Sequence, residues 1–160
     1  MDSSDRKAYV AGLRVLGRRE VSTAQLRQRL ERQAYDPADI DAALARLQAE
    51  HALDDRRTAL ACARSEVRLK GRGPARVRLR LRALGLDPAL VDETLRAVFG
   101  DEDERSLVER ALDRRLRQGT LSDPATERRL HRFLLGQGFS PSLVRDVLRH
   151  RRAGDAPGDD

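Results

Sequence analysis

The chain has very little cysteine and few aromatic residues, and each shortage excludes something. Cys62 is the only cysteine among 160 residues, so no intrachain disulfide can form. Only 3% of residues are aromatic, and the apolar residues are mostly Leu, Ala and Val, which suit helices. No segment alternates like a strand, and no apolar run reaches the length of a signal peptide or a membrane span. We therefore expect an all-α, cytoplasmic protein with Cys62 as a small buried residue.

The residues that carry most enzyme chemistry are scattered. His51, His131 and His150 lie far apart, and none has a His or Cys neighbour at the spacing of metal ligands. Residues 71–74 are rich in glycine but lack the Lys-Ser/Thr pair and the preceding strand of a phosphate-binding loop. They are better interpreted as a link between two helices. The sequence therefore predicts no metal site, no cofactor and no catalytic activity.

A motif of seven residue types recurs three times, at intervals of 51 and 53 residues. A repeat with a period of this length indicates one supersecondary unit used several times. Its apolar positions are spaced for the buried faces of two consecutive helices. The three copies are Leu26, Leu30, Tyr35, Asp36, Pro37, Ile40 and Leu44; Val77, Leu81, Leu86, Asp87, Pro88, Val91 and Leu95; and Leu130, Leu134, Phe139, Ser140, Pro141, Val144 and Leu148.

The centre of each copy has the signature of a helix end followed by a helix start. An N-cap residue is followed by a proline at the first helical position, where its missing N–H costs nothing. Gly85 and Gly138 stand where the preceding helix commonly ends with a left-handed residue. Ala34 occupies that place in the first copy, which predicts a different termination there. The three N-cap residues are Asp36, Asp87 and Ser140.

An additional helix before each copy completes a three-helix unit. Units of about fifty residues have small cores and usually depend on their neighbours for stability. We expect these upstream helices at residues 5–18, 55–70 and 102–118. The predicted units span residues 5–53, 54–100 and 101–152, followed by a disordered tail over residues 153–160.

The protein is strongly basic, and nearly all of its basic residues are arginine. The net charge is +6, and 30 of the 32 basic residues are arginine. Residues 64–82 contain eight bases and one acid, Glu66, so this stretch should attract a polyanion or an acidic protein surface. Leu79 replaces the polar residue of the other copies, so it either packs on a neighbouring unit or belongs to a contact surface. The predicted partner-binding residues are Arg68, Lys70, Arg72, Arg76, Arg78, Leu79, Arg80 and Arg82.

Several segments together resemble the RecX family, whose members regulate the RecA recombinase of bacteria. Leu53-Asp54-Asp55, followed by a helix and by Gly71-Arg72-Gly73-Pro74-Ala75-Arg76-Val77, is similar to the central signature of the family. Residues 132–139 with Val144 resemble its last repeat, and residues 22–40 its first. One departure is Thr58, because the family usually has phenylalanine there.

The resemblance implies a fold, a partner and a mode of action. The fold would be three tandem three-helix units in an elongated, curved arrangement. The protein would bind RecA and RecA filaments on single-stranded DNA, along the filament groove. There it would limit filament growth, ATP hydrolysis and strand exchange, and thus regulate recombination and repair. Contact with single-stranded DNA would be weak and made through phosphates, and the protein itself would be a monomer without catalytic activity.

Two alternatives remain open at this point. One is a stand-alone DNA-binding protein built from units like the helix-turn-helix. Against it, the third helices carry mixed charges, such as Asp39 with Arg46 and Asp92 with Arg96, and lack a cluster suited to reading bases. The other is a passive helical-repeat scaffold with an unrelated partner. Preference for RecA–DNA filaments over bare DNA at physiological salt would separate these possibilities.

Overall fold

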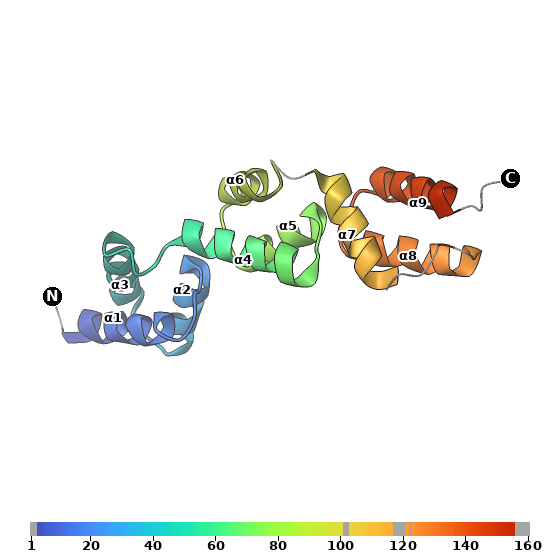
Figure 1. Ribbon diagram of the computed structural model, residues 1–160. Helices are drawn as coiled ribbons and strands as arrows, with labels where there is room; N and C mark the ends of the chain where they lie inside the picture. The colour runs from blue at the N-terminus through green and yellow to red at the C-terminus, as the bar shows by residue number, and fades with distance from the viewer. Residues whose placement is uncertain (1–2, 101–102, 117–120, 122, 156–160) are drawn as a thin grey trace, which may run out of the picture. The chain divides into compact units, whose positions relative to one another are not determined.

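The computed structural model describes residues 3–100, 103–116, 121 and 123–155, and within these ranges it contains nine α-helices and no strand (Figure 1). The predicted all-α fold is therefore confirmed. The helices are α1 (Ser3–Leu16), α2 (Thr23–Arg32), α3 (Pro37–Ala49), α4 (Asp55–Lys70), α5 (Pro74–Ala83), α6 (Pro88–Phe99), α7 (Glu104–Leu116), α8 (Pro124–Gly136) and α9 (Pro141–Asp155).

The helices fall into three consecutive sets of three, each containing one copy of the motif. Every apolar position of the motif is buried except Tyr35, which is half-buried against the core of the first repeat. The spacing therefore predicted the core correctly. The last helix, α9, extends to Asp155, three residues into the predicted tail, and the remainder of that tail lies outside the described residues. The exact repeat boundaries stay predictions.

The chain forms two compact units, and their boundaries do not coincide with those of the repeats. The first unit contains Met1–Cys62 and Arg80–Thr94, and the second contains Ala63–Leu79 and Leu95–Asp160. The middle repeat thus contributes helical segments to both units. Small repeat units that cannot bury enough apolar surface alone commonly share it with their neighbours in this way.

In the first compact unit, Ser22 connects the start of α2 to the end of α5. Its hydroxyl is fully buried and donates a hydrogen bond to the carbonyl oxygen of Leu84. The same hydroxyl accepts from the backbone N–H of Gln25 at 3.1 Å, which caps α2. A β-carbon on Gly85 would lie 2.7 Å from that of Ala24. The glycine therefore allows a close approach of the two helix ends.

In the second compact unit, the start of α5 meets the end of α8 in the same manner. The backbone N–H of Gly73 donates to the carbonyl oxygen of Gln137 at 2.8 Å, and that of Ala75 donates to Gly138 at 3.2 Å. A β-carbon on Gly138 would lie 2.4 Å from the backbone nitrogen of Arg76. Free N–H groups at one helix start thus satisfy carbonyl groups just beyond another helix end.

The termination of α2 differs from the sequence-based prediction. Ala34 adopts a left-handed φ of 59°, as Gly85 and Gly138 do at 71° and 93°. The backbone N–H of Ala34 donates to Glu31 at 2.9 Å, and the next N–H donates to Leu30 at 3.4 Å. This is the cap expected for glycine. The prediction of a different termination was wrong, because an exposed alanine can accept this strained conformation when the cap hydrogen bonds are retained.

Replacing Ala34 with glycine is expected to stabilise the protein. Left-handed backbone costs an alanine roughly 1–2 kcal/mol, while the greater freedom of glycine in the unfolded chain offsets part of this gain. We expect a net gain of about 0.5–1 kcal/mol and a rise of about 2–4 °C in melting temperature by circular dichroism. Ala42→Gly, at an exposed position inside α3, is the control and should destabilise by a similar amount. Destabilisation by both glycines would contradict the strain at residue 34.

The surroundings of two further residues, Thr58 and Cys62, bear on the sequence analysis. Thr58, at the position where the family usually has phenylalanine, is buried, and its hydroxyl donates to Glu20 Oε2 at 3.0 Å. Cys62 is only half-buried, so the prediction that it is a small buried residue was wrong.

Candidate functional site

The solvent side of α5 carries an apolar residue surrounded by arginines. Val77 and Leu81 of this helix are fully buried, and the opposite side forms what we call the α5 face. The side chain of Leu79 is 61% exposed, which favours the contact-surface alternative over packing on a neighbouring unit. Arg78 is half-buried on the flank of the helix. The α5 face consists of the exposed residues Arg76, Leu79, Arg80 and Arg82.

Two of the predicted binding residues instead surround a buried acid. The Glu66 carboxylate is 4% exposed, accepts a hydrogen bond from Lys70 Nζ at 2.7 Å and forms a second ion pair with Arg72. Burial raises the pKa of Glu66, but the hydrogen bond from Lys70 and the charge of Arg72 outweigh burial and lower it overall. Glu66 is therefore charged at neutral pH. Glu66 thus neutralises part of the charge that Lys70 and Arg72 bring to the basic stretch.

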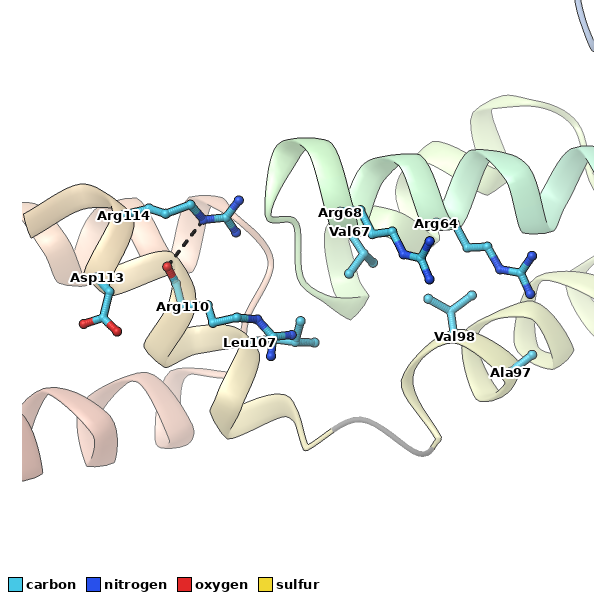
Figure 2. Close-up of a pocket in the computed structure, with 9 residues that line it drawn as sticks. All are labelled: Arg64, Val67, Arg68, Ala97, Val98, Leu107, Arg110, Asp113 and Arg114. Atoms are coloured by element: carbon cyan, nitrogen blue, oxygen red, sulfur yellow. Dashed lines mark hydrogen bonds between the residues drawn. The ribbon is translucent and has the colours of Figure 1, made fainter. Parts of the chain in front are cut away.

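Arg68 contributes to a third location, a cleft of about 860 Å³ within the second compact unit (Figure 2). Arg64 and Arg68 extend from α4 toward Val98 of α6, and Arg110 extends from α7 beside Leu107. We call this space the arginine cleft. It is lined by Arg64, Val67, Arg68, Ala97, Val98, Leu107, Arg110, Asp113 and Arg114.

A glycine in the link after α4 lies against one wall of the arginine cleft. Gly71 has a left-handed φ of 61°, and a β-carbon there would lie 2.8 Å from Arg114 Nη2. Arg114 Nε also donates to the carbonyl oxygen of Arg110 at 3.4 Å, the contact drawn in Figure 2. Sequence reasoning missed Arg110 and Arg114, because only the packing of α7 in this unit brings them near Arg64 and Arg68. The only local feature of the sequence that points to the cleft is the i, i+4 spacing of Arg110 and Arg114, which Arg64 and Arg68 share.

The predicted binding residues are thus divided among three surroundings. Arg68 lines the arginine cleft, Lys70 and Arg72 hold Glu66, and the α5 face contains the remaining exposed residues. Within the described ranges, no group of three His, Cys, Asp or Glu residues is placed to hold a metal ion. No helix within these ranges has the length and apolarity needed to span a membrane.

Together, these features define a class of protein: a tandem array of three-helix units with an arginine-rich surface at its centre. Models of the first, second and third three-helix domains of RecX match residues 8–47, 54–95 and 102–148. The chain therefore belongs to the RecX family, which consists of regulatory proteins. The resemblance stated from the sequence is confirmed.

Curated relatives and solved structures agree with this assignment. The regulatory protein RecX of Chlorobaculum tepidum is 31% identical over 137 residues, which cover 86% of this chain and 83% of the relative. The regulatory protein RecX of Leptothrix cholodnii is 36% identical over 137 residues, with coverage of 86% and 84%. The crystal structure of RecX from Lactobacillus salivarius matches with a TM-score of 0.76 over 96% of this chain and 99% of that one. At 18% identity, this structural likeness shows the fold.

Proposed function

We propose that this protein binds RecA and RecA filaments on single-stranded DNA and lowers their ATP hydrolysis and strand exchange. It acts as a monomer in the cytoplasm and regulates recombination and repair without catalysing a reaction. Family membership supports the class of regulator. The observation that supports a protein partner is the exposed α5 face, with its leucine among arginines.

The exposed Leu79 favours a protein partner over bare DNA. Arginine side chains strengthen binding to DNA phosphates, whereas a leucine side chain adds little affinity for them. Protein interfaces, in contrast, combine an apolar centre with arginines that also reach polar groups of the partner. Arg76 and Arg80 lie on one side of Leu79 on α5 and Arg82 lies on the other, so the α5 face has the composition of a small protein contact. Further contacts by the outer repeats would increase the affinity through multivalency.

Titration of the protein into a RecA ATPase assay on single-stranded DNA tests this function. We expect ATP hydrolysis to fall as the protein is added, because binding along the filament limits its growth. Binding to a bare oligonucleotide is measured in parallel at the same physiological salt. Inhibition at concentrations that leave bare DNA unbound would separate filament binding from simple removal of DNA. Unchanged hydrolysis, together with a sequence-specific footprint on bare duplex DNA, would instead favour the stand-alone DNA-binding alternative.

A further inference from the structure

We propose that the arginine cleft is a binding site for the sugar-phosphate backbone of single-stranded DNA. Two pairs of arginines supply its positive charge: Arg64 and Arg68 on α4, and Arg110 and Arg114 on α7. Each pair has i, i+4 spacing, which sets its members one helical turn, about 5–6 Å, apart at their β-carbons. A strand with a regularly repeated negative charge can therefore meet successive guanidinium groups from both walls.

Three of the four cleft arginines are not neutralised by any acid of the described residues. No acid among the described residues lies within ion-pair distance, 4.0 Å, of Arg64, Arg68 or Arg114. The single acid of the lining, Asp113, accepts from Arg151 Nη2 of α9 at 2.8 Å. Arg151 thus compensates the one negative charge, and the cleft keeps its attraction for a polyanion.

A second arginine-lined cleft, between α8 and α9, has ion pairs that involve its own lining arginines. It has a volume of about 680 Å³. Its lining includes Glu127, which pairs with Arg152 at 3.6 Å, and Arg149 pairs with Asp146 at 3.7 Å. These pairs engage two of its five arginines and leave Arg128, Arg132 and Arg145 without an acid within 4.0 Å among the described residues. We assign the phosphate site to the cleft between α4, α6 and α7, because it is the larger of the two and its one lining acid pairs with Arg151, which lies outside the lining.

The remaining lining residues favour contact with the backbone of a strand over recognition of bases. Val67, Val98 and Leu107 provide apolar surface that can contact sugars and base faces. Among the nine lining residues there is no Asn, Gln or aromatic side chain to read base edges or to stack. Binding should therefore be independent of sequence. An acidic protein segment would need carboxylates at matching positions, whereas every nucleotide of a DNA strand carries a charge.

Fluorescence anisotropy with labelled oligothymidine and the full-length chain tests the site. The cleft variant Arg68→Gln with Arg114→Gln is compared with Arg32→Gln with Arg96→Gln, an equal charge change at exposed positions outside the described clefts. We expect the cleft variant to raise Kd about tenfold and the control to raise it less than about threefold. The salt slope should fall by about 1.4 for the cleft variant, because two phosphate contacts are lost.

Measurements on the parent protein keep the proposal testable if a variant fails to fold. Backbone amide shifts in NMR spectra with oligothymidine should concentrate on α4, α6 and α7 around the cleft. Competition by inorganic tripolyphosphate distinguishes a free polyphosphate ligand from a strand, and oligothymidine should bind more tightly. Equal weakening by both variant pairs, shifts located elsewhere, or preference for polyglutamate or tripolyphosphate would overturn the proposal. The inference deepens the proposed function, but its assay contains no RecA, so the two can fail separately.

Discussion

Replacing Gly138 with alanine is expected to destabilise the second compact unit by about 2–5 kcal/mol. A left-handed backbone at φ 93° is strained for alanine, which costs roughly 1–2 kcal/mol. The new β-carbon would also lie 2.4 Å from the backbone nitrogen of Arg76. Such overpacking against backbone typically costs another 1–3 kcal/mol, roughly. The melting temperature should fall by roughly 10 °C in a thermal scan followed by circular dichroism.

Gly136→Ala provides a matched control two residues away. Gly136 is the last residue of α8, and a β-carbon there would have no heavy atom within 4 Å. Its replacement should be neutral or stabilise by up to about 1 kcal/mol. Hydrogen exchange should show faster exchange at the N–H groups of Gly73 and Ala75 in the Gly138 variant, because their acceptors belong to the displaced segment. Equal melting of the two variants would contradict the role assigned to this junction.

The repeated motif predicted the helices and their buried positions because both depend on local spacing. Leu26 and Leu30 lie one turn apart on α2, and Asp36 caps the following helix, so each signal is contained within a few residues. The same local logic failed at Ala34. There the cap hydrogen bonds of the whole turn outweigh the conformational preference of one residue.

Contacts between repeats could not be predicted, because they join residues far apart in the chain. Gly73 and Gln137 are 64 positions apart, and the bond between them uses only backbone atoms, which leave no trace in residue type. The glycine at residue 138 gave a partial signal, but its most obvious explanation was a helix cap. The close approach of Arg76 adds a second reason for glycine at that place.

The candidate sites show the same division between local and distant information. Composition identified the basic stretch, and projection of α5 placed Arg76, Leu79 and Arg80 outside the core. The burial of Glu66 was missed, because a lone acid among arginines looks exposed until packing is known. The arginine cleft was missed for a related reason, since α7 supplies half of its arginines.

Replacing both Arg76 and Arg80 with glutamate is expected to abolish inhibition of the RecA ATPase. These residues line one side of Leu79 on the α5 face, and both are exposed. Two charge reversals replace attraction to an acidic surface or to phosphate by repulsion, so the loss should exceed that caused by the double alanine variant. ATP hydrolysis by RecA on single-stranded DNA, measured over a titration of each variant, gives the comparison.

The fold should survive these reversals, which makes the ATPase result interpretable. Arg76 lies in the first turn of α5, where a negative charge is favourable, and Arg80 lies in the last turn, where it is unfavourable. The two effects are each about 0.3–1 kcal/mol and largely cancel, so helicity and melting temperature should stay near those of the parent. Arg32→Glu with Arg96→Glu controls for net charge and should still inhibit. If the α5 variant inhibits as well as the parent, the α5 face is only a solvated surface. The contact would then be sought in the third repeat, beginning with the exposed Arg128, Arg129 and Arg132.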